Sequence, residues 1–401
     1  MRVICTAGHV DHGKSALVRA LTGMEPDRFA EEQRRGLTID LGFAWTRLGS
    51  PPRTLAFVDL PGHERFVPNM LAGAGAVDLA LFVVAADEGW MPQSSEHLAI
   101  LDLLGVTHGV VALTKVDLVD RDRLQQVAAD VRARLKPTAF AAAELVAVSA
   151  TTGTGLDELR QRLVELVDAA PAPADRGRPR LWVDRVFTVR GAGTVVTGTL
   201  AGGRLRLGDT LAVLPGRRHG RVRGLQSLRE PIEEARPGSR VAVNLSGVDR
   251  DDVARGDALG VPAQWLSVRT FDAWVRALPG AVVDRRGAWH VHIGSGERSA
   301  VLHTVAGRPV DDSGGHVRIE LDRAAAITAG DRFVLREAGR RATLGGGIVL
   351  DCDPPRRPRG RERAARIAAL DARRDAVAAD DRARLLALAV RERGAVRAAR
   401  A

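Results

Sequence analysis

Cysteine is nearly absent from the 401 residues: Cys5 and Cys352 are the only two, and they stand far apart without ligand-spaced partners. Their isolation excludes both a disulfide framework and a Cys-based metal site, and we expect two small core residues. Long apolar runs are also missing, and Met1 leads directly into a strand pattern with no charged n-region. We therefore expect a cytoplasmic protein with no membrane association.

Lysine is equally scarce, because Lys14, Lys115 and Lys136 are the only three among 59 Lys and Arg. Arg serves almost everywhere else that a cation occurs. A lysine therefore indicates a position where a compact ammonium on a flexible stem does something that a planar guanidinium cannot. Lys14 and Lys115 both fall inside motifs considered below.

The net charge of +10 is unevenly distributed along the chain. From Pro354 onward there are 14 Arg against 6 Asp and Glu, a surplus of eight, whereas the preceding residues carry 45 Lys and Arg against 43 Asp and Glu. The body is thus nearly balanced. The charge distribution alone gives no reason to expect a nucleic-acid-binding body.

Short β-branched runs alternate with helical stretches in the first 170 residues, which predicts a mostly parallel sheet with helices on both faces. The strand and helix pairs are 3–6 and 14–21, 55–59 and 65–71, 79–85 and 95–104, 110–114 and 121–135, and 145–149 and 156–167. After the Pro/Ala stretch at 171–174, short runs separated by Gly, Pro and Asp predict two β-barrels. From Arg361 the pattern predicts one or two basic helices.

Residues Gly8 to Ser15 match the phosphate-binding pattern G-x-x-x-x-G-K-S between a predicted strand and a predicted helix. Backbone N–H groups can hold phosphates there, Lys14 can reach the β and γ oxygens, and the Ser15 hydroxyl can ligate Mg²⁺. The phosphate-binding residues we expect are Gly8, Val10, Asp11, His12, Gly13, Lys14, Ser15 and Gly62.

Three further motifs end successive predicted strands and favour guanine nucleotides. Asp59 begins an Asp-x-x-Gly unit and puts a carboxylate at the Mg²⁺ shell, with the Gly62 amide near the γ-phosphate. Asp117 can accept hydrogen bonds from guanine N1 and N2, which adenine does not offer in that arrangement. The expected guanine-binding residues are Thr114, Lys115, Asp117, Ser149 and Ala150.

These motifs, together with Arg35-Gly36-Leu37-Thr38 and His63-Glu64, resemble the translational GTPases related to elongation factor Tu. The resemblance implies that His63 positions the attacking water, that Thr38 joins Ser15 and Asp59 as a Mg²⁺ ligand, and that Val10 and Leu37 form a hydrophobic gate. Independently, phosphoryl transfer needs a water-orienting group, and the carboxamide that other GTPases use is absent at position 63.

The stretch from Gly23 to Trp45 and segments of the second and third domains look like the selenocysteine-specific elongation factor. By that resemblance Asp184, Arg185, Phe187 and Arg240 belong to an aminoacyl pocket. A selenol is largely anionic near neutral pH, and burying an anion requires a paired cation, which Arg185 and Arg240 would supply. Asp184 would orient a guanidinium or the aminoacyl amine.

We therefore expect a GTP-binding domain at 1–172, a β-barrel with the aminoacyl pocket at 173–262, a second barrel at 263–353 and a basic helical tail at 354–401. The expected function is GTP-dependent, Mg²⁺-assisted delivery of selenocysteinyl-tRNA to the ribosome by a monomer, with release of GDP. The tail has room for at most part of a winged helix, so we do not assign binding of the mRNA recoding hairpin to this chain.

Two alternatives stay open at this stage. An elongation factor Tu-like carrier of ordinary aminoacyl-tRNA would need a pocket that tolerates neutral side chains. A GTPase subunit that regulates a metabolic enzyme, such as a sulfate-activating complex, would not bind aminoacyl-tRNA at all.

Overall fold

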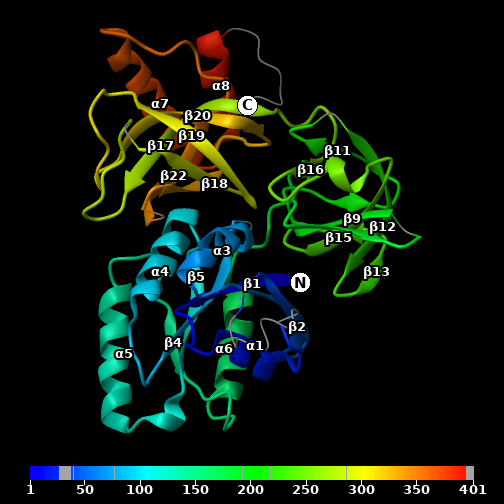
Figure 1. Ribbon diagram of the computed structural model, residues 1–401, viewed down its shortest axis with the longest axis vertical. Coiled ribbons are helices and arrows are strands. Elements are labelled where there is room, and N and C mark those ends of the chain that lie inside the picture. The colour runs from blue at the N-terminus through cyan, green and yellow to red at the C-terminus, as the bar shows by residue number, and fades with distance from the viewer. Residues whose placement is uncertain are drawn as a thin grey trace.

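The computed structural model describes residues 1–26, 38, 40–75, 77–191, 193–216, 218–285, 287–340 and 342–393. Figure 1 shows an α/β domain from the N-terminal part of the chain, a barrel beside it, and a second barrel that carries the C-terminal helices. Within these residues no helix is both long and apolar enough to cross a bilayer.

The first domain has a six-stranded sheet in the order β2-β3-β1-β4-β5-β6, in which only β2 is antiparallel to its neighbour. Every residue of β1 and β4 is buried, as expected of parallel strands covered on both faces. The strands are β1 (Arg2–Gly8), β2 (Gly42–Leu48), β3 (Arg53–Asp59), β4 (Leu79–Ala85), β5 (His108–Thr114) and β6 (Glu144–Ala147). The sequence reading missed β2.

Two groups of helices cover the two faces of this sheet. One face packs against α3 (Val67–Ala74), α4 (Pro92–Leu104) and α5 (Arg121–Leu135), and the other against α1 (Lys14–Thr22) and α6 (Leu156–Ala169). Glycines in the left-handed conformation stand at both ends of α1, Gly13 with φ 82° and Gly23 with φ 71°. Short 3₁₀ turns occupy η1 (Glu64–Phe66) and η2 (Val116–Leu118). The predicted α/β domain is confirmed.

The second domain is an antiparallel sheet whose strand path returns to its start, since β11 pairs with both β16 and β12. Its strands are β7 (Arg180–Trp182), β8 (Arg185–Val189), β9 (Gly193–Ala201), β10 (Leu205–Arg206), β11 (Thr210–Leu214), β12 (His219–Ser227), β13 (Glu230–Ile232), β14 (Glu234–Ala235), β15 (Arg240–Ser246) and β16 (Ala258–Gly260), with the 3₁₀ turn η3 (Arg250–Asp252). Alternating burial along β15 shows that one face lines the core.

The third domain is a closed barrel in the order β17-β20-β19-β18-β21-β22. Its strands are β17 (Val268–Ala277), β18 (Trp289–Ile293), β19 (Gly296–Thr304), β20 (Gly315–Ala325), β21 (Arg332–Glu337) and β22 (Ala342–Asp351). Both predicted barrels are thus confirmed. Contacts from α4 reach this barrel, where Glu96 accepts a hydrogen bond from Thr343 at 2.9 Å and Asp102 pairs with Arg276 at 2.5 Å.

Helices α7 (Glu362–Ala378) and α8 (Arg382–Arg393) pack on the third barrel, as Figure 1 shows. Arg366 of α7 donates to Asp272 at 2.7 Å and to Asp351 at 2.6 Å, and both carboxylates are almost fully buried. Arg318 of β20 adds a two-bonded pair with Asp272. Leu370 completes the attachment with an apolar contact.

Removing the Arg366 guanidinium should destabilise the third domain, because two buried carboxylates lose a shared cation. We expect Arg366→Ala to lower the free energy of unfolding by about 3–5 kcal/mol, measured on the full chain by urea unfolding with tryptophan fluorescence. Arg363→Ala, an exposed arginine one turn earlier on α7, should cost less than about 1 kcal/mol. Equal losses would mean that apolar contacts alone hold the helices.

Candidate functional site

The sequence motifs of the first domain meet at one edge of its sheet. Gly8 ends β1, Asp59 ends β3 and Thr114 ends β5, and these three strands run parallel. Ser149 follows β6, the next parallel strand. In open α/β sheets ligands bind outside the carboxyl ends of the strands, and this edge is that place.

The loop between β1 and α1 has the backbone of a phosphate cradle. Gly8, Asp11 and Gly13 have φ of 138°, 61° and 82°, and a Cβ on Gly8 would lie 2.1 Å from the Val83 carbonyl oxygen. A side chain is therefore excluded at Gly8. Lys14 folds over the loop and donates from Nζ to the carbonyl oxygens of Gly8 at 3.0 Å and His9 at 2.6 Å.

Asp59 is completely buried beside the start of α1. It accepts hydrogen bonds from Ser15 at 2.6 Å and from Thr6 at 2.5 Å, and the Ser15 hydroxyl lies 2.9 Å from that of Thr38. Burial raises the pKa of Asp59, and the two hydrogen bonds oppose that rise. The structure thus brings together the three predicted Mg²⁺ ligands, Ser15, Thr38 and Asp59. Their hydroxyl and carboxylate oxygens are the donor type that Mg²⁺ prefers.

Gly62 and His63 lie against this loop. A Cβ on Gly62 would come within 2.4 Å of Lys14 Nζ and 2.7 Å of Val10 N, so only glycine fits. His63 caps η1 and accepts a hydrogen bond from the Arg65 N–H on its Nδ1 at 3.2 Å. A neutral ring therefore carries its proton on Nε2. Leu37, the other predicted gate residue beside Val10, belongs with 27–37 outside the described residues.

The predicted base-binding residues form a second group at the same edge. Thr114 donates its hydroxyl to the His12 carbonyl oxygen at 2.7 Å and so ties β5 to the phosphate loop. Lys115 pairs with Asp87 at 3.2 Å and with Glu88 at 3.0 Å. Asp117 is exposed in η2. Ser149 is buried, its Oγ accepts from the Thr152 N–H at 3.1 Å, and Ala150 follows it directly.

Side chains of α4 support the phosphate loop from beneath, which the sequence reading did not anticipate. The Gly8 N–H donates to His97 Nδ1 at 3.0 Å, and the Val10 N–H donates to Gln93 Oε1 at 3.0 Å. Burial lowers the pKa of His97 to about 3, and burial with the neighbouring His9 lowers that of His12 to about 4. The four-residue spacing of Gln93 and His97 places both on one helix face and was the available signal.

Three of the four predicted aminoacyl residues, Arg185, Phe187 and Arg240, line a cavity of about 200 Å³ between the first and second domains, and Asp184 lies behind them. The guanidinium carbons of Arg240 and Arg185 lie 3.5 and 4.7 Å from the ring centroid of Phe43 on β2. Arg240 makes a two-bonded pair with Asp184, at 2.6 and 2.9 Å. Asp184 is thus bonded to a guanidinium, and its role in an aminoacyl pocket stays a prediction.

Arg185 has a different carboxylate partner, one that comes from the first domain. Its Nη2 lies 3.1 Å from Asp40 and also donates to the Leu41 carbonyl oxygen. Asp40 pairs in addition with Arg255 at 3.4 Å. Phe187 also lines the cavity and is 41% exposed. Sequence reasoning did not identify Phe43, which lines the cavity, or Asp40, which pairs with Arg185, because only the fold brings them to the second domain.

Each of the three domains of the fold overlaps the match to a known protein family. Residues 1–169 match the family described as Elongation factor Tu GTP binding domain, residues 193–260 match Elongation factor Tu domain 2, and residues 280–356 match the beta-barrel domain of the selenocysteine-specific elongation factor.

Individual relatives extend the similarity. The chain is 42% identical over 352 residues to the selenocysteine-specific elongation factor of Desulfomicrobium baculatum, which covers 87% of this chain and 55% of that protein. It is 34% identical over 382 residues to elongation factor Tu 2 of Streptomyces avermitilis, and this match covers 86% of this chain and 95% of that protein. A crystal structure of a bacterial selenocysteine-specific elongation factor matches with a TM-score of 0.82 and 31% identity over 96% of this chain and 63% of that one. The chain spans about half the length of the Desulfomicrobium protein.

The neutral ring of His97 makes the first domain sensitive to acid. Since burial depresses the pKa of His97 to about 3, its contribution to stability is complete above the unfolded value of about 6.5 and is lost as pH falls below it. From pH 6.5 to pH 5 we expect that loss to approach about 2 kcal/mol. His97→Gln keeps an acceptor for the Gly8 N–H without a titrating ring, so its melting temperature should fall less over this range. Parallel falls in both proteins would contradict the assignment.

Proposed function

We propose that this chain, which belongs to the elongation factor Tu family of translational GTPases, binds GTP, carries selenocysteinyl-tRNA to the ribosome at recoded stop codons and hydrolyses GTP on release. The observation that carries the substrate assignment is the pair of guanidiniums, Arg185 and Arg240, stacked on Phe43 in the cavity between the first two domains.

The phosphate loop, residues Gly8 to Ser15, would bind the nucleotide phosphates with its N–H groups, the start of α1 and the Lys14 ammonium. The Gly62 backbone lies close to Lys14 Nζ, so the Gly62 amide would meet the same γ-phosphate that Lys14 reaches. Ser15, Thr38 and Asp59 would hold Mg²⁺. When bound, the ion neutralises charge on the phosphate oxygens. Asp117, exposed beside the loop, would accept the guanine N1 and N2 hydrogen bonds, with Thr114, Lys115, Ser149 and Ala150 shaping the base site.

His63 would position the attacking water. Because its Nδ1 accepts from the Arg65 N–H, the Nε2–H is the group left to donate to water. A donated hydrogen bond orients the water for attack on the γ-phosphorus and does not deprotonate it. Val10 of the phosphate loop and Leu37 would form the apolar gate that keeps His63 from the water until the ribosome engages.

His63→Ala should leave GTP binding unchanged and lower ribosome-stimulated hydrolysis by about 10²-fold or more, the range for a positioned catalytic group. The measurement is single-turnover phosphate release with and without programmed ribosomes. His219→Ala, an exposed histidine on β12, serves as the matched control and should hydrolyse at the wild-type rate. Wild-type turnover in His63→Ala would remove His63 from the mechanism.

A buried selenolate between Arg185 and Arg240 would meet two cations that already have internal partners. Asp40 and Asp184 neutralise these guanidiniums in the structure, so a ligand anion replaces or shares an existing pair and no bare charge is left without it. A neutral seryl group cannot form an ion pair with either guanidinium, so it does not compensate for disturbing their pairs with Asp40 and Asp184. The pocket would therefore discriminate by penalising the wrong substrate as well as by binding the right one.

Asp40 also suggests how the nucleotide state reaches the pocket. It lies two positions after Thr38, whose hydroxyl is 2.9 Å from that of Ser15. Occupation of the Mg²⁺ and phosphate site would fix Thr38, and with it the carboxylate that holds Arg185. The aminoacyl pocket and the nucleotide site would thus be coupled through Thr38 and Asp40, which are two positions apart in the sequence.

The proposed domains are 1–172 for GTP, 173–262 for the aminoacyl pocket, 263–353 for the second barrel and 354–401 for the helical tail. The chain would act as a cytoplasmic monomer with GTP or GDP, charged tRNA and the ribosome as partners. Two other functions remain as competing outcomes. A carrier of ordinary aminoacyl-tRNA would bind the seryl and selenocysteinyl forms alike, and a regulatory GTPase subunit would bind neither.

Two aminoacylated forms of the same tRNA, selenocysteinyl-tRNA and seryl-tRNA, test the substrate assignment. Arg185→Ala and Arg240→Ala should each weaken the binding of selenocysteinyl-tRNA by a few kcal/mol, because a buried charge loses a partner. The binding of seryl-tRNA should weaken far less. The quantity to measure is the ratio of the two dissociation constants in the GTP-bound protein at fixed salt. We expect this ratio to change by at least about tenfold, which corresponds to about 1.4 kcal/mol.

Arg223→Ala is the control, because Arg223 is exposed on β12 of the same domain outside the cavity. It should leave the ratio unchanged. A parallel loss for both charged forms in Arg185→Ala and Arg240→Ala, with a smaller salt dependence, would show that the two arginines contact the tRNA backbone instead.

A further inference from the structure

The third barrel and the segment that leads into α7 border a cavity of about 260 Å³. Its walls come from the turn before β18, from the end of β19 with the residues that follow, and from the chain between β22 and the first turn of α7. Three arginines, Arg285, Arg357 and Arg363, line it together with His303. No Asp or Glu of the described chain belongs to this lining, and the nucleotide and aminoacyl sites use none of its residues.

The three cavity arginines have no carboxylate partner, unlike Arg366 and Arg373 of α7, which bond to buried or half-buried carboxylates. Among the residues that the structure describes, none of the three guanidiniums makes an ion pair or a hydrogen bond. The fourth titratable group, His303, has its Nε2 3.7 Å from Glu320 on β20, outside the lining. With a neutral histidine, the lining therefore carries three positive charges and no negative one.

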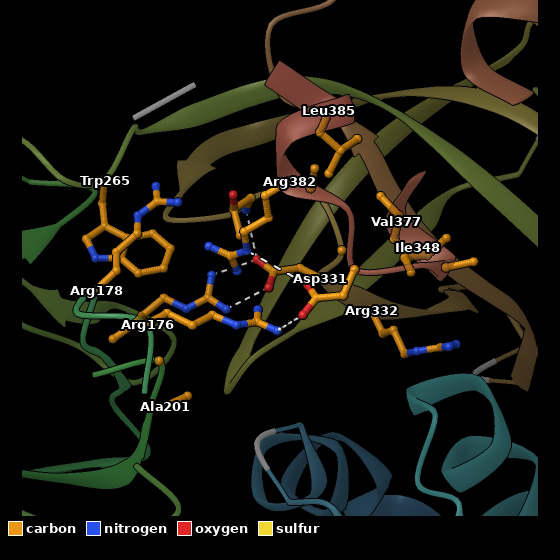
Figure 2. Close-up of a pocket in the computed structure, with 17 residues that line it drawn as sticks. Arg176, Arg178, Ala201, Trp265, Asp331, Arg332, Ile348, Val377, Arg382 and Leu385 are labelled. Atoms are coloured by element: carbon orange, nitrogen blue, oxygen red, sulfur yellow. Dashed lines mark hydrogen bonds and ion pairs between the residues drawn. The ribbon is translucent and has the colours of Figure 1, made fainter. Parts of the chain in front are cut away.

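The charged cavity of about 470 Å³ in Figure 2 has the opposite arrangement. Its lining contains two carboxylates, and each of them already pairs with arginines of the same lining. Asp331 bonds to Arg180 at 2.6 Å, while Asp380 lies 2.8 Å from Arg176 and 3.8 Å from Arg382. These internal anions give no reason to expect a ligand anion there, whereas the cavity beside β19 has none of its own.

The fold holds the three cavity arginines near one another. A Cβ on Gly307, which has φ 79°, would lie 2.9 Å from Arg363 Nη1, so this guanidinium packs on the turn after β19. Burial lowers the pKa of His303, and the nearby Arg357 and Arg285 lower it further by repelling a protonated ring. All three guanidiniums thus gather around the end of β19. Like charges repel at such close range, and an anion between them relieves the repulsion.

We propose that this cavity binds a phosphate monoester of a small molecule, with Arg285, Arg357 and Arg363 as its cationic contacts. A phosphate monoester carries about two negative charges and three strong acceptor oxygens at neutral pH. Guanidiniums match these oxygens in geometry. A phosphodiester of a nucleic-acid backbone carries only one charge and matches three convergent cations less well. Val305 and Pro358 add apolar surface to the lining for the organic part of the ester.

The test uses the full chain saturated with GDP and Mg²⁺, so that the nucleotide site is already filled. Phenyl phosphate is titrated by calorimetry at about pH 7.5, where it is a dianion. Phenyl sulfate has a similar shape with a single charge and is the matched ligand control. We expect phenyl phosphate to bind at least about fivefold more tightly than phenyl sulfate, because its second charge meets a cationic lining.

Variants of the lining locate the site. Arg285→Gln and Arg357→Gln should each weaken the binding of phenyl phosphate by at least about fivefold, because each removes a charge-assisted hydrogen bond. Arg384→Gln removes the same charge from an exposed position of α8 outside the cavity, and it should change the affinity by less than about twofold. Arg285 and Arg357 are exposed, so both variants should fold, which thermal melting reports. Arg363→Gln replaces either variant if it unfolds.

Each outcome decides the proposal. Binding of phenyl phosphate that the cavity variants weaken and Arg384→Gln does not weaken supports it. Failure of the wild-type protein to bind phenyl phosphate overturns it. Equal affinities in wild-type and cavity variants also overturn it, and this is the result expected if the probe occupies the aminoacyl cavity. A short single-stranded RNA without a terminal phosphate is titrated in parallel, and RNA binding that the variants weaken, without binding of phenyl phosphate, would replace the monoester by a nucleic-acid backbone.

Discussion

The hydrogen bonds to the buried Asp59 carboxylate are the interaction on which the candidate site at the sheet edge of the first domain depends. The carboxylate joins the end of β3 to β1 through Thr6 and to the start of α1 through Ser15. Thr38 meets the same Ser15 hydroxyl, and two residues later Asp40 reaches Arg185 in the second domain. One charge held away from water, stabilised by two hydroxyl donors and the Lys14 ammonium, therefore lies at the proposed nucleotide site, next to the residues that lead along the sequence to the proposed aminoacyl pocket.

The sequence predicted the strand-end motifs well because the physics behind them is local. A glycine-rich turn between a strand and a helix has one common use, and the boundaries of α5 at Arg121 and Leu135 follow from a periodic pattern with an Asp120 cap. The supports could not be found in the same way. His97 holds the N–H of Gly8 from 89 positions away, and Asp40 finds Arg185 across a domain boundary. Only the packing of α4 and β2 creates those contacts.

Residues 354–401 show a limit of counting charges in the sequence. Their surplus of eight positive charges suggests an exposed basic segment, yet Arg366 and Arg373 are buried and contact carboxylates inside the protein. Composition counts both as free cations, although Arg366 fastens α7 to the barrel and Arg373 bonds to Glu392 of α8. A basic total thus counts together the arginines that fasten elements inside the protein and those that are exposed, such as Arg363 and Arg384, and the sequence alone does not separate them.

The rarity of lysine has a practical consequence for handling the protein. Lys14 is enclosed by the phosphate loop and Lys115 is held by two carboxylates, while Lys136 is exposed just beyond α5. Burial also lowers the pKa of the Met1 amino group, so this amine stays reactive at neutral pH. Amine-directed coupling should therefore attach dyes or a solid support at two defined points of the first domain, one beside Ser227 of the second domain and one just beyond α5.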